Sequence, residues 1–166
     1  MPWLEAWHGT RASFDRFDAG FLGTASGSIN CTGFFFTLDR AVAADYALAE
    51  GACEDPFGGP GVPALLRCRV LIDNPADLRI DGAVGTGQLA LLQRLCVNEG
   101  RDALILRGLE DSPTLLRRSD HLVVFDADRV RIIERLDGVA ALAILSQARA
   151  NEPRFEPEMD LDWCVS

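Results

Sequence analysis

The chain has 166 residues, of which 48% are hydrophobic, and its formal net charge is −9. This length and composition predict one domain with a single apolar core and argue against global disorder. The negative charge argues against a nucleic-acid partner, because proteins that bind nucleic acids usually carry a basic surface. No apolar stretch approaches the ~18 residues that a membrane span requires, and residues 1–5 show no signal-peptide pattern.

In the first half of the chain, the patterns predict a strand at residues 3–8, a long loop rich in Gly and Ser at 11–32, and an aromatic strand at 33–36. Asp39 then predicts a helix N-cap, and apolar residues at helical spacing predict a helix over about 40–50, which Gly51 can end. A loop at 52–63 follows, then a strand at 64–72 and a turn at 73–75.

In the second half, we expect a helix over about 86–98 that ends near Gly100, and strands at 103–106, 122–125 and 130–133. A polar connection covers 110–119, a turn covers 126–128, and an alanine-rich helix covers 139–150. Short strands mixed with helices, without regular βαβ alternation, predict an α+β fold. Residues 1–150 are expected to form the domain, and 151–166 an acidic C-terminal tail.

All 16 basic residues are arginines, and a local basic patch remains open around Arg67, Arg69, Arg117 and Arg118. The five cysteines are an odd number without a Cys-x-x-Cys pair, which argues against zinc ligation and a disulfide framework. We therefore expect reduced thiols in a cytosolic compartment. Cys68 and Cys96 stand in apolar contexts and are expected to be small core residues.

The chain has only two histidines, and both stand in short motifs. His8 belongs to Trp7-His8-Gly9-Thr10 and follows an apolar run, while His121 opens the second run Leu122-Val123-Val124-Phe125-Asp126. Between them stand Gly33-Phe34-Phe35-Phe36 and the helical Ala43-Ala44-Asp45-Tyr46. Each motif alone is weakly specific, but their order along the chain is informative.

These four segments, over roughly residues 5–135, resemble the ADP-ribosyltransferase superfamily, in the lineage of poly(ADP-ribose) polymerases and diphtheria-toxin-like enzymes. The resemblance implies an ADP-ribosyltransferase-like split β-sandwich with peripheral helices, and NAD as the co-substrate. It also implies that His8 binds a ribose hydroxyl of NAD and that the backbone of Gly9 holds the nicotinamide carboxamide. Phe35 and Tyr46 would sandwich the nicotinamide ring, since stacking requires only a π face.

Three further residues complete the expected NAD-binding set. Phe36 neighbours the stacking position, and Thr10 and Arg11 would help to hold the adenosine side. Strand alternation puts Phe34 and Phe36 on one face of the sheet and Phe35 on the other. The core is then expected on the first face, which leaves Phe35 to line a cleft.

The sequence departs from the family where the family carries its catalytic Glu, because His121 stands there. A carboxylate stabilises the positive charge that develops as nicotinamide leaves. Neutral imidazole can accept the same hydrogen bond without supplying negative charge, and protonated imidazole can do neither. Asp120 replaces the Glu if a bulge turns it inward. Glu99 and Glu110 are poorer candidates, and a metal site built from His8, His121 and Asp120 lacks a spacing signature.

The leading interpretation is therefore an NAD-dependent mono-ADP-ribosyltransferase that uses His8, Tyr46 and His121 or Asp120, with a protein as the expected acceptor. A mono-transferase is expected because the resemblance ties chain elongation to the missing Glu. The alternatives are a catalytically impaired module that binds NAD, ADP-ribose or a protein, and a divergent enzyme acting on another nucleotide. The expected setting is the cytoplasm, or a host cell into which the domain is delivered as a toxin or effector.

Overall fold

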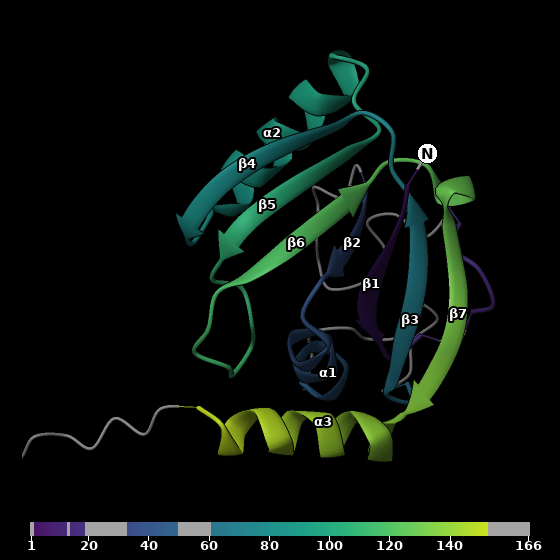
Figure 1. Cartoon of the computed structure of the whole chain (residues 1–166), viewed down its shortest axis with the longest axis vertical. Helices are drawn as coiled ribbons and strands as arrows, with labels where there is room; N and C mark the ends of the chain where they lie inside the picture. The colour runs from purple at the N-terminus through teal and green to yellow at the C-terminus, as the bar shows by residue number, and fades with distance from the viewer. Residues whose placement is uncertain (1, 13, 19–32, 50–60, 153–166) are drawn as a thin grey trace, which may run out of the picture.

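The computed structural model describes residues 2–12, 14–18, 33–49 and 61–152 (Figure 1). Seven strands form one sheet: β1 (Trp3–Thr10), β2 (Phe34–Thr37), β3 (Ala64–Leu71), β4 (Pro75–Gly82), β5 (Ala103–Leu109), β6 (Ser119–Val124) and β7 (Val130–Asp137). The helices are α1 (Arg40–Leu48), α2 (Thr86–Asn98) and α3 (Gly138–Ala150), with a short 3-10 helix at Ala127–Arg129. The predicted mixture of short strands and peripheral helices is confirmed.

The strands lie in the order β4-β5-β6-β2-β1-β3-β7. Only β4 and β5 are parallel, and every other neighbouring pair is antiparallel. Such a mixed sheet without repeated βαβ units is the α+β arrangement that the sequence predicts. Within the described residues, no helix is long and apolar enough to cross a membrane.

Most predicted elements are confirmed with small shifts at their ends. Asp39 is the N-cap of α1, and its carboxylate accepts a hydrogen bond from the Ala41 amide. That helix ends at Leu48, so the expected stop at Gly51 lies outside the described residues, as do 19–32, 50–60 and 153–166. The prediction missed β4, which begins at Pro75, the last residue of the expected turn. Its alternation of Ala, Leu and Ile with Asp and Arg is the ordinary pattern of a half-buried strand.

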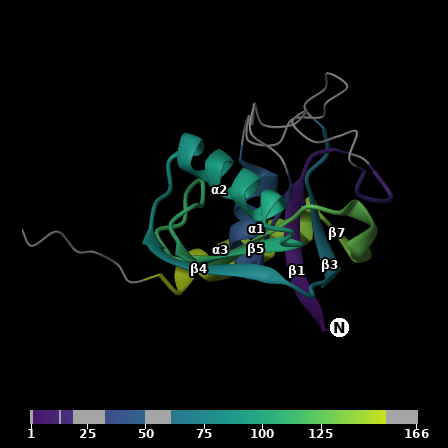
Figure 2. The same cartoon turned by 90° about the horizontal axis from the view of Figure 1, so that it is seen from above.

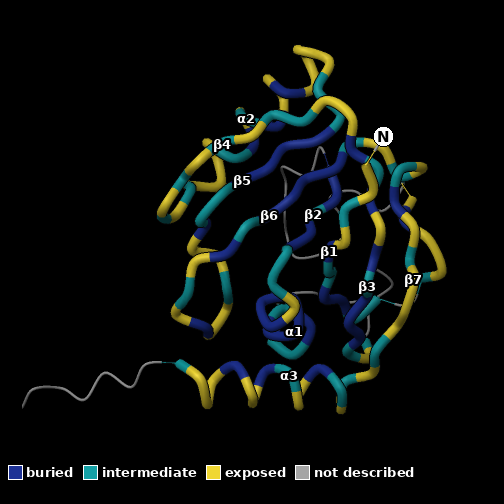
Figure 3. The backbone as a smooth tube through the Cα atoms, viewed as in Figure 1, coloured by how far each residue is buried: buried dark blue, intermediate teal, exposed yellow. Residues whose placement is uncertain are grey.

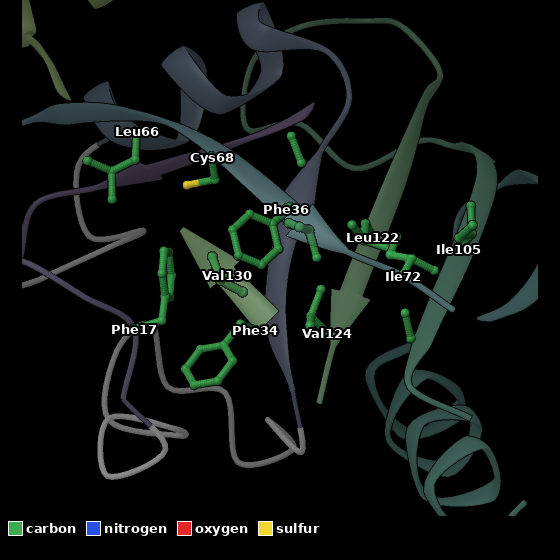
Figure 4. Packing of buried hydrophobic residues seen from close by; sticks show 13 residues of the cluster. Phe17, Phe34, Phe36, Leu66, Cys68, Ile72, Ile105, Leu122, Val124 and Val130 are labelled. Carbon is green, nitrogen blue, oxygen red and sulfur yellow. The ribbon is translucent and has the colours of Figure 1, made fainter. Parts of the chain in front are cut away.

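Three apolar clusters cover the two faces of the sheet. The first lies on one face and includes the side chains of Phe34, Phe36, Leu66, Leu122 and Val124 (Figure 4). On the other face, the second cluster packs strands β1, β3 and β7 against α1 and α3, and the third packs β5 and β6 against α2. Accordingly, α2 lies beside β4 and β5, whereas α1 and α3 lie together at the lower ends of β1 and β3 (Figures 1 and 2).

β1 and β2 share fewer paired residues than any other two neighbouring strands of the sheet. These strands pair only at Trp7 and Thr37, whereas β1 pairs with β3 along its whole length. The sheet therefore consists of two halves, β4-β5-β6-β2 and β1-β3-β7, which join at one point (Figure 1). Both halves contribute to the first apolar cluster, so packing on that face holds the halves together.

Candidate functional site

His8 lies on β1, one residue beyond the junction, and its side chain connects the two halves. Its Nδ1 donates a hydrogen bond to the carbonyl oxygen of Phe35 on β2, at 2.7 Å. Because a carbonyl oxygen only accepts, Nδ1 carries the proton and Nε2 is the acceptor in the neutral ring. Burial lowers the pKa of His8 below its ordinary value, against the opposing effect of the Phe35 carbonyl. His8 is therefore a neutral imidazole in a fixed orientation.

Two phenylalanines of the segment after β1 cover the His8 ring. The ring centroid of Phe17 lies 5.1 Å from that of His8, in an edge-to-face arrangement, and Phe14 lies 6.4 Å away. Phe17 also contacts Phe34 and Phe36. Arg135 of β7 holds this segment by donating to the carbonyl oxygen of Phe14 at 2.8 Å. The rings restrict approach to His8 from the face of the first cluster.

The three residues after His8 make structural contacts. A Cβ added to Gly9 would overlap the carbonyl oxygen of Ala43, so glycine is required where α1 packs against β1. Thr10 is buried, and its hydroxyl accepts from the amide of Ala12 at 3.0 Å. The Arg11 guanidinium donates to the carbonyl oxygens of Ala47 and Leu48 at the C-terminus of α1. A cation is favourable there, because the last carbonyls of a helix carry partial negative charge.

His121 begins the apolar part of β6 and is only 4% exposed. Its Nε2 lies 2.9 Å from the Ser119 hydroxyl, and Nδ1 forms no hydrogen bond with any residue that the structure describes. Burial lowers the pKa of His121, although the charges of Asp111, Asp120 and Asp39 oppose that shift. A pKa below the ordinary 6.5 makes the neutral imidazole the main form of His121 at pH 7.

The two histidines point to opposite faces of the sheet. Trp7 pairs with Thr37, and Thr37 pairs with His121, so these three side chains share one face. His8 follows Trp7 directly and therefore points to the other face, toward Phe36. The strand order places β2 alone between the strands that carry His8 and His121. The histidines thus flank the junction from its two sides.

Phe35 and Tyr46, the two rings expected to sandwich nicotinamide, pack against different apolar clusters. Phe35 packs against the third cluster, beside Leu104 and Val123, whereas Tyr46 of α1 packs against the second cluster. Both lie on the face that carries His121. The expectation that only the opposite face would form core missed that α2 and α1 cover this face too.

Asp120 is held away from the junction by β5. Its carboxylate accepts from the Gly108 amide at 3.0 Å and binds the Arg107 guanidinium at 3.1 Å. Asp120 would turn toward the junction if its own strand, β6, carried a bulge. The extra residue lies instead on β5, between Leu106 and Leu109, where Gly108 adopts a φ of 67°. Asp120 therefore stabilises a bulge on the neighbouring strand.

Sequence interpretation missed Asp45, which fixes the loop that leads into β6. Its carboxylate is buried and accepts hydrogen bonds from the Ser112 hydroxyl, from the Thr114 amide and hydroxyl, and from the Leu115 amide, at 2.6–3.2 Å. Burial would raise the pKa of Asp45, but these four donors bring it below the ordinary value. A charged residue on the apolar side of a helix, three positions after Val42, was the available signal.

A hollow of about 450 Å³ lies within the same loop, between β5 and β6. Its lining consists of Glu110, Ser112, Leu115, Leu116, Arg117 and Arg118. None of the predicted site residues lines it. Arg117 binds Asp39 at 3.1 Å and Arg118 binds Glu110 at 2.9 Å, so carboxylates already neutralise both guanidinium groups.

No group of three or more His, Cys, Asp or Glu side chains in the described residues is arranged to hold a metal ion. Cys68 and Cys96 are both buried and free, as expected, and burial raises the pKa of Cys68 to about 12. No protein-family model matches the chain, and no curated protein matches it. The functional assignment therefore depends on the residues and their geometry.

Proposed function

We propose that this chain is an NAD-dependent mono-ADP-ribosyltransferase with a split β-sandwich fold, which transfers ADP-ribose to a protein acceptor. The supporting observation is the position of the motifs that resemble the ADP-ribosyltransferases. They lie on β1, β2, α1 and β6, and the three strands are neighbours at the centre of the sheet. His8 and His121 both lie beside the single Trp7–Thr37 pair, on opposite faces of the sheet.

His8 has the protonation state that ribose binding needs. With Nδ1 bonded to the Phe35 carbonyl, Nε2 presents a lone pair that can accept a hydrogen bond from a sugar hydroxyl. The lowered pKa keeps that lone pair available at neutral pH. The Nδ1 contact also fixes the direction of the lone pair, which reduces the entropy lost when a ligand binds.

His121 can assist the departure of nicotinamide by accepting a hydrogen bond from the neighbouring ribose. This role requires a lone pair on Nδ1 and therefore a proton on Nε2, which would donate to the Ser119 hydroxyl. A neutral imidazole orients the sugar but adds no negative charge to stabilise the developing cation. We therefore expect a transferase that is slow and adds one ADP-ribose unit.

The ligand must pass through the junction to contact both histidines, because their side chains lie on opposite faces. An extended dinucleotide would meet this requirement by passing between β1 and β2 beyond the Trp7–Thr37 pair, beside the His8–Phe35 hydrogen bond. Its nicotinamide end would face Tyr46 and His121, and a ribose hydroxyl would reach Nε2 of His8. Phe14 and Phe17 would have to move aside to admit it.

A second candidate function is binding of NAD or ADP-ribose without cleavage. One observation favours it: Asp120, the carboxylate next to His121, is already held by Arg107 and by the Gly108 amide. Consequently neither Asp120 nor His121 places a negative charge beside the reacting sugar. The two functions differ in whether free nicotinamide appears.

The test is to incubate the folded protein with NAD and measure free nicotinamide for the wild type and for His8→Ala, His121→Ala and Asp120→Ala. The proposed enzyme releases nicotinamide, loses this activity in both histidine variants, and keeps it in Asp120→Ala. Loss in Asp120→Ala alone would make Asp120 the carboxylate that replaces the family's Glu. NAD binding by calorimetry without nicotinamide release, with protein acceptors supplied, would establish the binding module instead.

A further inference from the structure

A pair of arginines faces solvent on β3 and β7, on the part of their face that α1 and α3 leave uncovered. Arg69 on β3 and Arg131 on β7 are directly opposite in the antiparallel register, and both are exposed. Neither forms a hydrogen bond or an ion pair with any residue the structure describes. Like charges directly opposite on neighbouring strands are destabilising. The pair therefore costs stability in a protein whose net charge is strongly negative.

The surrounding side chains extend this pair into a binding surface. Trp3 of β1 lies on the same face and is 44% exposed, and the Arg131 guanidinium lies 5.2 Å above its ring. The two nearby carboxylates, Glu5 and Glu134, both bind Arg67. Glu5 stands opposite Arg69 in the register of β1 and β3, but it forms its ion pair with Arg67. Figure 3 shows the exposed colour along β7 and at the N-terminal part of β1. We call Trp3, Arg69 and Arg131 the arginine–tryptophan surface.

We propose that the acidic stretch 153–166 of this chain binds to the arginine–tryptophan surface. In this stretch Glu156, Glu158, Asp160 and Asp162 occur at every second position, between the apolar residues Phe155, Met159, Leu161 and Trp163. In an extended chain such alternation puts all four carboxylates on one side. Those carboxylates supply negative charge that balances the positive charges of Arg69 and Arg131.

The stretch starts on the correct face and is long enough. Helix α3 packs with Leu65 and Leu136, which share their face of β3 and β7 with Arg69 and Arg131. The 13 residues of α3 cover ~20 Å, and the step along β7 from Leu136 to Arg131 covers ~17 Å. Asp162, the last of the four carboxylates, lies ten residues beyond Glu152 and reaches ~33 Å in an extended chain. Because α3 runs across the lower ends of β3 and β7 (Figure 1), the direct distance from its C-terminus to Arg131 is shorter than the sum of these two legs, so Asp162 can span it.

The test is hydrogen–deuterium exchange of the full chain at low ionic strength, read over residues 153–166. We expect the amides there to exchange about tenfold more slowly in the wild type than in Arg69→Glu/Arg131→Glu. The matched control is Arg40→Glu/Arg94→Glu, two exposed arginines on helices, which should keep the slow exchange. Added salt should remove the protection, and thermal melting checks that each variant is folded.

Two outcomes overturn the proposal. One is rapid exchange of residues 153–166 in the wild type, equal to that of the Arg69→Glu/Arg131→Glu variant. The other is binding of a single-stranded oligonucleotide to the same surface without competition from the acidic stretch. The test needs no NAD, so its failure is separate from failure of the proposed enzymatic function.

Discussion

The imidazole of His8 and the backbone of Phe35 join the two halves of the sheet through a 2.7 Å hydrogen bond. The bond lies next to the Trp7–Thr37 pair, at the place where β1 and β2 stop pairing. It fixes the tautomer of His8 and thereby assigns its two nitrogens to separate tasks. Nδ1 maintains the structure, and Nε2 remains to accept from a ligand.

Replacement of His8 by asparagine separates these two tasks. The Asn amide nitrogen can occupy the position of Nδ1 and donate to the Phe35 carbonyl, but nothing replaces Nε2. We expect His8→Asn to lose about 1–3 kcal/mol of unfolding free energy, because the hydrogen bond is kept but the ring contacts with Phe17 and Phe36 are lost. NAD affinity should fall about tenfold or more. Denaturant unfolding and calorimetry measure the two effects. Unchanged NAD affinity would show that Nε2 does not contact the ligand.

The lowered pKa values of His8 and His121 predict a loss of stability at mildly acidic pH. In the unfolded chain both imidazoles take up protons near their ordinary pKa of 6.5, whereas in the folded protein they do so only at lower pH. The unfolded state therefore binds more protons between these values, and the unfolding free energy falls as pH drops below about 6.5.

Urea unfolding at a series of pH values between about 5 and 8 measures this dependence. His121→Gln should flatten the slope below pH 6.5, because one of the two titrating groups is removed. If His121 works as a neutral acceptor, nicotinamide release should be constant from pH 6.5 to 8 and decrease only at lower pH. A wild-type unfolding free energy that is constant down to pH 5 would contradict the account of both histidines.

Substitution of Asp45 by asparagine should loosen the loop between β5 and β6. The Asn side chain cannot accept from all four donors and presents an amide where the Thr114 and Leu115 amides point. We expect a loss of about 2–3 kcal/mol at neutral pH. Asp128→Asn, at an exposed position, is the matched control and should cost almost nothing. Equal melting temperatures for the two variants would exclude this role of Asp45.

The close packing of α1 on β1 predicts that Gly9→Ala is strongly destabilising. The added methyl group would overlap the Ala43 carbonyl oxygen. That oxygen belongs to the backbone of α1, and a Cβ has a fixed position on its own backbone, so neither group can rotate away. We expect a loss of ~3 kcal/mol. Gly87→Ala provides the comparison, since nothing lies within 4 Å of the added atom and alanine favours the helix by about 1 kcal/mol. Equal stability of the two variants would mean that α1 can shift.

The sequence predicted most elements because their signals are local. The alternation of β3 and the N-cap of α1 depend on neighbouring residues, and both are found as predicted. The missed strand β4 carries such a signal too, but its charged residues and the preceding turn obscured it. Local patterns also identified Cys68 and Cys96 as buried.

Local sequence patterns could not predict the geometry of the candidate site. Alternation correctly separates Phe35 from Phe36, but it does not reveal that α2 covers the face of Phe35. The opposite orientation of His8 and His121 depends on the registers of β1, β2 and β6, which pair residues 30 and 84 positions apart. The partners of Asp120 likewise depend on a bulge in another strand.

The most direct test of the central claim is the rate at which the wild-type protein releases nicotinamide from NAD, compared with His8→Asn under identical conditions. We predict release by the wild type above the rate without protein, and a loss of at least about tenfold in the folded variant. Equal rates for the two proteins, or wild-type release no faster than in buffer with protein acceptors present, would contradict the assignment of this site to NAD cleavage.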